Sequence, residues 1–180
     1  MKPLKLFFIF LLFVVIAGGI LTLVLPTHQQ INRSVTINAP ASTIYENISH
    51  LENFNKWSVW NQQDSTMVHT MSGTDGTVGA STSWNGSAEI SGEGKMTIIG
   101  LEPNKSVSHD IEFIAPRKGS AVSNISMKED VNSTVVTWNF KMETPRPWNI
   151  FNLIYNMEKQ MGKDFENGLN ALKKISESKN

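Results

Sequence analysis

Cysteine is absent from the 180-residue chain. Disulfide bonds, thiolate catalysis and cysteine-based metal sites are therefore excluded. An excess of one charge is also lacking, because 16 Lys and Arg residues balance 16 Asp and Glu residues. No basic run or RNA-binding signature occurs, and proteins that bind nucleic acid normally carry a basic surface. We expect no nucleic-acid partner.

Recognisable catalytic motifs are missing as well. The sequence has no Gly-x-Ser-x-Gly elbow, no phosphate-binding loop and no His-Glu-x-x-His motif. The four histidines stand at no spacing typical of metal ligands; they are His28, His50, His69 and His109. We therefore predict no catalytic residue, no metal site and no cofactor, and a binding module is favoured over an enzyme.

One long apolar run is present, from Leu6 to Leu25, with 20 residues and no charge. As an α-helix this run would span about 30 Å, the thickness of the hydrocarbon core of a bilayer. A membrane anchor fits the run, and so does a signal peptide with a small-residue cleavage site at Ala17-Gly18-Gly19. The anchor is favoured because the apolar residues continue beyond that site.

The orientation follows from Lys2 and Lys5, which precede the run, since positive residues beside a span favour the cytoplasmic side. The remainder of the chain should then lie outside the cytoplasm, on the periplasmic or extracellular face. We predict an anchor or signal peptide in residues 1–27, with residues 6–25 in the membrane, and a single domain in residues 28–180. The stretch PTHQQINR forms the short connection.

The predicted outer domain starts with one strand and short helices. Residues 31–37, INRSVTI, alternate apolar and polar side chains, which is typical of a strand. Pro40 suits a first helical turn, and Ile44 and Ile48 follow at helical spacing. We predict one or two short helices that end near Trp57.

Six further strands are predicted from period-two alternation between glycine-containing turns. They cover residues 66–73, 80–86, 94–102, 106–114, 121–129 and 133–143. Even spacing and short turns predict an antiparallel meander. Residues 149–175 then carry apolar side chains at steps of three and four, which predicts one long amphipathic helix that covers the apolar face of the sheet.

Several stretches resemble the polyketide cyclase/dehydrase-like branch of the SRPBCC superfamily, which includes START lipid-transfer domains and birch-pollen-allergen-like proteins. VTINAPASTIYENISHLENFNKWSVW is similar to the opening strand, turn, short helices and Trp pair of that family. GASTSWNGSAEISGEGKMTI is similar to its strand–turn–strand with Gly-Glu-Gly. VTWNF and MGKDFENGLNALKKI are similar to its last strand and C-terminal helix. The likeness covers residues 31–177.

The resemblance implies an α+β fold called the helix-grip, in which a curved antiparallel sheet of about seven strands wraps around the long C-terminal helix. Here one transmembrane helix precedes it. The resemblance also implies a cavity between sheet and helix that holds a small hydrophobic or amphipathic, lipid-like ligand. The family has no universal catalytic residue that could be carried over to this chain.

Candidate cavity residues are the large side chains expected between sheet and helix. His109, for example, alternates with Val107 and Ile111 and should share their face. Packed core and cavity wall use the same residue types, so both roles stay open for each candidate. The ligand-binding candidates are Trp57, Trp60, Trp84, His109, Trp138, Phe140, Met142, Phe151 and Tyr155. We favour Trp57 as an inward plug and Trp60 as a residue of the cavity rim.

Three functions are compatible with these observations. The favoured one is a membrane-tethered outer domain that binds a small apolar molecule or a lipid. The second is an enzyme of cyclase or hydratase type, with His109 and Tyr155 as polar groups in the cavity. The third is a structural or interaction domain with a filled core. Free volume between sheet and helix separates the first two functions from the third.

Overall fold

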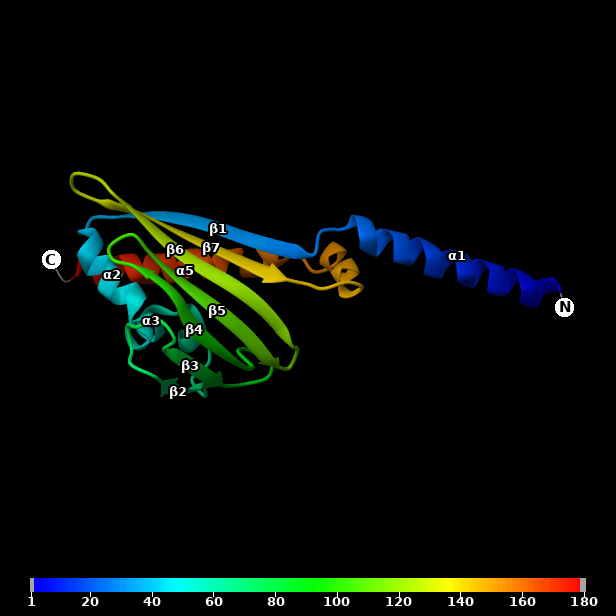
Figure 1. Ribbon diagram of the computed structural model, residues 1–180, viewed down its shortest axis with the longest axis horizontal. Helices are drawn as coiled ribbons and strands as arrows, with labels where there is room; N and C mark the ends of the chain where they lie inside the picture. The colour runs from blue at the N-terminus through cyan, green and yellow to red at the C-terminus, as the bar shows by residue number, and fades with distance from the viewer. Residues whose placement is uncertain (1, 179–180) are drawn as a thin grey trace.

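The structure is a computed structural model that describes residues 2–178. Its helices are α1 (Lys2–Val24), α2 (Ala41–Ser49), α3 (Leu51–Trp57), α4 (Val59–Gln63), the 3-10 helix η1 (Trp148–Leu153) and α5 (Met157–Glu177). Its strands are β1 (His28–Ile37), β2 (Val68–Ser72), β3 (Ser81–Asn85), β4 (Glu93–Glu102), β5 (Ser106–Ala115), β6 (Gly119–Glu129) and β7 (Thr134–Glu143). Figure 1 shows their arrangement. The predicted α+β composition is confirmed.

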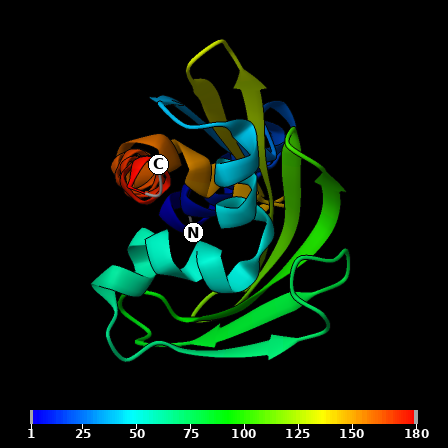
Figure 2. The same ribbon diagram turned by 90° about the vertical axis from the view of Figure 1, so that its left-hand side faces the viewer.

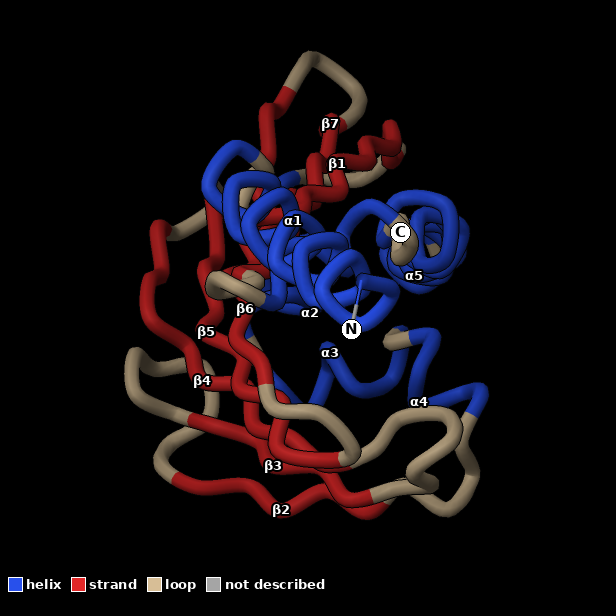
Figure 3. Tube along the Cα trace, turned by 90° about the vertical axis from the view of Figure 1, so that its right-hand side faces the viewer, coloured by secondary structure: helices blue, strands red, loops and turns tan. Residues whose placement is uncertain are grey.

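The seven strands form one antiparallel sheet in the order β1-β7-β6-β5-β4-β3-β2. Strands β2 to β7 follow one another as neighbours, so the predicted meander is confirmed. β1 pairs with the free edge of β7, where Val35 lies opposite Val136. Figure 3 shows the sheet as a curved wall with the helices on its concave side.

The C-terminal helix α5 lies within the curve of this sheet, as Figure 2 shows in a view along the helix. Its side chains Phe165, Leu169 and Leu172 are buried. These residues continue the three- and four-residue spacing of the sequence, so one stripe of the helix faces the interior. The predicted helix-grip arrangement is confirmed.

Trp138 on β7 is central to the packed core. Its ring centroid lies 4.6 Å from that of Phe165 on α5 and 5.3 Å from that of Trp57 on α3. Both contacts are edge to face, which is a favoured arrangement of aromatic rings. The Trp138 Nε1 group donates a hydrogen bond to Ser123 Oγ at 2.8 Å, so its polar atom is satisfied in the interior.

The C-terminal helix is shorter than the predicted range 149–175. A separate 3-10 helix, η1, precedes it, and α5 begins at Met157 after the N-cap Asn156, whose side chain accepts a hydrogen bond from the Lys159 N–H at 3.0 Å. The reason is a long-range contact: Asn149 Nδ2 donates to the backbone oxygen of Thr22 at 2.8 Å. That bond holds η1 against the end of α1 instead of in line with α5.

Two further boundaries differ from the predictions. β1 begins at His28, three residues earlier than predicted, because its first residues pair with β7 as far as Glu143. Most of the predicted connection is therefore strand. The short helices include α4, which was not predicted, so that Ser58 separates Trp57 at the end of α3 from Trp60 within α4.

Helix α1 extends away from the remainder of the molecule (Figure 1). Pro3–Val24 is long and apolar enough to cross a membrane, and its apolar stretch is not buried against the rest of the protein. Membrane anchors and N-terminal signal sequences share these properties. The last turn of α1 is bonded to the segment around η1, where Arg146 Nε donates to Thr22 O at 2.9 Å. This contact fixes α1 at one end of the sheet.

Candidate ligand-binding cavity

The strand register defines the inner face of the sheet. Met96 on β4 lies opposite Thr82 on β3 and Ile111 on β5. Ile111 in turn lies opposite Ala121 on β6, which is paired with Met142 on β7. Directly opposed residues share a face of the sheet, so this row of side chains points toward the helices.

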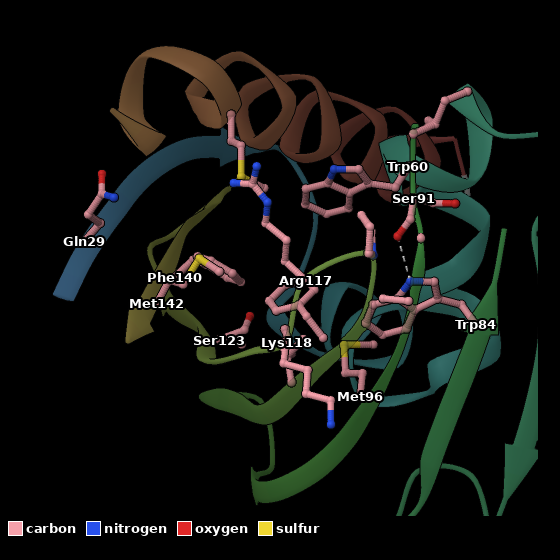
Figure 4. A pocket seen from close by; sticks show the side chains of 18 of the residues that line it. Gln29, Trp60, Trp84, Ser91, Met96, Arg117, Lys118, Ser123, Phe140 and Met142 are labelled. Carbon is pink, nitrogen blue, oxygen red and sulfur yellow. Dashed lines mark hydrogen bonds between the residues drawn. The ribbon is translucent and has the colours of Figure 1, made fainter. Parts of the chain in front are cut away.

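A cavity of about 1060 Å³ lies between this face and the helices (Figure 4). The volume is slightly above the range of about 300–1000 Å³ that is typical of small-molecule sites. Its deep wall consists of buried and mainly apolar side chains, namely Phe54, Ser58, Thr82, Met96, Ile111, Ser123, Trp138 and Phe140. None of these residues is charged, so the interior suits an apolar group.

One wall of the cavity depends on Gly94 in β4. A Cβ atom at this position would lie 2.2 Å from Trp84 Cζ2, so only glycine leaves room for the indole. Trp84 Nε1 donates a hydrogen bond to Ser91 O at 3.0 Å, as Figure 4 shows, and its ring meets Phe113 edge to face at 6.1 Å. Trp84 is thereby held as part of the wall.

Most of the predicted cavity residues line this space. Seven of the nine do so: Trp60, Trp84, Trp138, Phe140, Met142, Phe151 and Tyr155. They come from α4, β3, β7 and the segment around η1, which are far apart in the sequence. The fold brings them together because β3 and β7 contribute to one sheet and α4 and η1 lie on its concave side.

Trp57 and His109 do not line the cavity, and their assignment as lining residues is corrected. Trp57 is fully buried in the core, and its Nε1 donates to Asn47 O at 2.9 Å. His109 is fully buried too, and its ring lies beside that of Phe54, with centroids 5.7 Å apart. Phe54 lines the cavity instead of these two residues.

His109 lies opposite Ile98 on β4 and Ser123 on β6. Neither of its ring nitrogens has a hydrogen-bond partner among residues 2–178. Burial lowers the pKa of His109 to about 4, because the charged imidazolium is poorly solvated there. The ring is therefore neutral at neutral pH.

These findings bear on the alternative functions. The enzymatic alternative placed His109 and Tyr155 together as polar cavity groups, but only Tyr155 lines the cavity, whereas His109 lies in the core. Within the described part of the chain, no group of three or more His, Asp or Glu side chains could hold a metal ion. The cavity itself contradicts the alternative of a completely filled core.

The mouth of the cavity lies at the end of the sheet to which α1 is attached. The register brings the start of β1 and the end of β7 together there, since His28 lies opposite Glu143. The end of β5 and the start of β6 meet at the same end, where Phe113 lies opposite Gly119. The exposed lining residues belong to this end: Ala88, Glu89, Ile90, Pro116, Arg117, Lys118, Glu143, Pro145, Trp148, Phe151, Ile154 and Tyr155.

The mouth carries two basic and two acidic side chains. Arg117 and Lys118 lie in the turn between β5 and β6, and neither forms an ion pair within residues 2–178. Figure 4 shows the Arg117 side chain reaching across the cavity toward the helix on its far side. The acidic lining residues of the mouth are Glu89 and Glu143, and Glu143 also forms an exposed ion pair with Lys141 at 3.1 Å. A charged rim thus surrounds an uncharged deep wall, with the basic side chains of the rim together on one turn.

The turn between β3 and β4, which also borders the mouth, is held by Asp64. Its carboxylate accepts hydrogen bonds from the Ser91 hydroxyl, from the Ser87 N–H at 2.8 Å and from the Thr66 hydroxyl at 2.6 Å. The bond from Ser91, followed by that from Thr66, lowers the pKa of Asp64 to about 2. The carboxylate is charged at neutral pH and joins this turn to the segment before β2.

Several lining residues were not predicted from the sequence. Ile111 and Phe113 alternate with His109 on a predicted strand, and Met96 lies on another, so the same alternation could have identified them. Arg117 and Lys118 gave no comparable signal. They are polar residues of a turn in the sequence, and only the fold places that turn at the cavity mouth.

Structures with low sequence identity share this fold. A protein from Nitrosospira multiformis matches with a TM-score of 0.60 and 18% identity, over 84% of this chain and 100% of that chain. Ara h 8.0201 matches with a TM-score of 0.58 and 8% identity, over 84% and 99% of the respective chains. The di-domain ARO/CYC StfQ from the steffimycin biosynthetic pathway matches with a TM-score of 0.63 and 6% identity, over 85% of this chain and 52% of that chain.

The curved sheet, the enclosed helix and the cavity define a helix-grip protein. Residues 28–177 match the family described as polyketide cyclase/dehydrase and lipid transport, and the chain belongs to this family. The resemblance to the SRPBCC superfamily that the sequence motifs indicated is thereby confirmed. No curated protein matches the sequence.

Proposed function

We propose that the protein is a membrane-tethered domain outside the cytoplasm that binds a small hydrophobic or amphipathic, lipid-like molecule in the cavity. The observation that supports this function most strongly is the mainly apolar, uncharged deep wall of a cavity of about 1060 Å³. Contact of apolar surface with water costs about 25 cal/mol per Å². A ligand with an apolar body removes this cost, because it replaces water along the wall.

The family supports the same class of ligand, since its description includes lipid transport. The charge distribution refines the class. The deep wall has no charged side chain, whereas Arg117 and Lys118 lie at the mouth. An amphipathic molecule with its apolar part inside and an anionic or zwitterionic head at the mouth matches both regions.

The tether is proposed from α1, whose exposed apolar residues match the length of a membrane span. Lys2 and Lys5 at its start favour a cytoplasmic N-terminus, which places the cavity on the outer side.

The test compares lipids that co-purify with the full chain and with two matched variants. Met142→Trp enlarges a side chain that lines the cavity, whereas Lys141→Trp places the same indole on the opposite face of the same strand. Each protein is extracted in mild detergent, and bound molecules are identified by mass spectrometry. Lipids that associate only with α1 are common to all three proteins.

We expect at least one lipid-like molecule, present at close to one per chain, in the parent protein and in Lys141→Trp. Met142→Trp should retain much less of it. The proposed function is wrong if no such molecule distinguishes Met142→Trp from Lys141→Trp while both variants remain folded by circular dichroism.

A further inference from the structure

Helix η1 presents a row of exposed apolar side chains at the cavity mouth. Residues three apart in a 3-10 helix lie on the same side, so Trp148 and Phe151 align with Ile154 at the C-cap. Their exposed fractions are 61%, 53% and 84%. The rings of Trp148 and Phe151 are stacked, with centroids 6.1 Å apart and planes at 13°, so the row is continuous. Large exposed apolar groups that are contiguous indicate an interaction surface.

The neighbouring side of η1 is bonded to the remainder of the protein. Asn149 and Asn152 are also three residues apart. Asn149 Nδ2 donates to Thr22 O at 2.8 Å and to Leu25 O at 3.0 Å. Asn152 Oδ1 accepts a hydrogen bond from Gln29 Nε2 at 2.9 Å. These bonds prevent η1 from rotating its apolar row into the protein.

The position of the row relative to α1 indicates which partner it meets. Arg146 donates to Thr22 O at 2.9 Å and to Leu23 O at 3.1 Å, so carbonyls of the last helical turn are bonded to the segment that leads into η1. When α1 spans a bilayer, its last turn lies at the membrane surface. The row then lies at the same level, where Trp and other amphipathic aromatic groups are favoured.

We propose that the row formed by Trp148, Phe151 and Ile154 inserts into the interfacial layer of the membrane that α1 crosses, on its outer leaflet. This inference rests on the tether in the proposed function. Because the same three residues also line the cavity, its mouth opens onto the lipid surface. Arg117 and Lys118, on the other side of the mouth, match the phosphate groups of the lipids. A lipid-like ligand then enters from the bilayer without crossing water.

The absence of cysteine permits a direct test with single-cysteine variants of the full chain, each carrying a nitroxide spin label. The labels are placed at Ile154→Cys in the row, at Val131→Cys in the turn between β6 and β7, and at Leu12→Cys within α1. Val131 is the matched control, because it is 90% exposed but lies at the opposite end of the sheet. The proteins are reconstituted into vesicles of phosphatidylcholine and phosphatidylglycerol.

Collision of each label with oxygen, which partitions into lipid, is compared with collision with a water-soluble nickel chelate. We expect the oxygen-to-nickel ratio at position 154 to exceed that at position 131 severalfold and to lie below that at position 12, because the interfacial layer is shallower than the middle of the span. Equal ratios at 154 and 131 overturn the docking proposal. Low accessibility of 154 to both reagents also overturns it, because that result indicates a protein contact such as a second copy.

The label at position 12 separates the causes of failure. If position 12 is in lipid and position 154 is in water, docking is wrong but the tether stands. If position 12 is also in water, both are wrong. The measurement does not depend on what the cavity contains, so its failure is distinct from a failure of ligand binding, which the comparison of Met142→Trp with Lys141→Trp tests.

Discussion

Trp60 and Trp138 meet edge to face, with ring centroids 6.1 Å apart and ring planes at 86°. Trp138 is buried in the core, Trp60 is half-buried in α4, and both line the cavity. Trp57, three residues earlier, contacts the same Trp138 ring but does not line the cavity. The Trp138 ring therefore lies at the boundary between packed core and cavity wall.

Replacing the two tryptophans on either side of this boundary should have different effects. Trp57→Ala removes a fully buried side chain and should lower the free energy of unfolding by about 3–5 kcal/mol. Trp60→Ala should cost less, because the side chain is half-buried, and should mainly reduce the amount of co-purified ligand. Denaturant unfolding of the full chain in detergent measures the first effect, and mass spectrometry measures the second. Similar stability losses and unchanged ligand in both variants would contradict this assignment.

His109 should make stability depend on pH. Its folded-state pKa of about 4 lies below the unfolded-state value of about 6.5, so the unfolded state binds more protons between these values. The free energy of unfolding should therefore be independent of His109 protonation above about pH 6.5. It should decrease toward pH 4, by at most about 1.4 kcal/mol per pH unit.

The variant His109→Leu should abolish most of this slope. A smaller slope should persist, because burial lowers the pKa of His69 as well. At pH 7 the variant should gain up to about 1–3 kcal/mol, since it removes a buried imidazole without hydrogen-bond partners in the described chain. Unfolding curves at pH 7.5 and pH 5 provide the test. If the free energy of unfolding differs between the two pH values by the same amount in His109→Leu as in the parent protein, the pH dependence arises from other groups.

Gly94→Ala should disturb the cavity wall. The new methyl group would lie within 2.2 Å of Trp84 Cζ2 and 2.6 Å of Glu112 O, so the indole must move. We expect a loss of about 1–3 kcal/mol, typical of overpacking, together with reduced ligand binding. Gly100→Ala on the same strand is the control, because the nearest atom to its Cβ is 3.5 Å away. Near-ultraviolet circular dichroism and unfolding should change in the first variant only.

Asn149→Ala should loosen the connection between η1 and α1. The substitution removes both hydrogen bonds to Thr22 O and Leu25 O, while the sheet and α5 keep their contacts. We expect the spin label at position 154 to become more mobile in its EPR spectrum and the label at position 131 to stay unchanged. An unchanged spectrum at position 154 would mean that other contacts, such as those of Arg146, are sufficient to hold η1.

The sheet was predictable from the sequence because its residues alternate. The inward positions Val107, His109 and Ile111 are buried, as alternation on one strand predicts. The range 149–175 was misjudged because Ile150 and Ile154 also fit helical spacing. Their local pattern contains no information about the hydrogen bond that Asn149 donates to Thr22 O in α1, because the two residues are 127 positions apart in the sequence.

The site was predictable in part for a different reason. Large side chains such as Trp84, Phe140 and Met142 identified the face that lines the cavity. The same pattern could not distinguish His109 from these residues, because core and cavity wall have the same composition. That distinction depends on which helix covers each part of the sheet. Arg117 and Lys118 become residues of the cavity mouth only when the strand ends and η1 assemble at one end of the sheet.

Photo-crosslinking in the membrane tests the proposed binding of a lipid most directly. The full chain is reconstituted into nanodiscs whose phospholipids carry a diazirine at the end of one acyl chain, and adducts are located by peptide mass spectrometry after irradiation. Binding in the cavity predicts adducts on α1, as for any span, and also on peptides that contain the deep residues Met96 and Phe140, with the latter adducts lost in Met142→Trp. Adducts confined to α1 and η1 would contradict the proposal that lipid occupies the cavity.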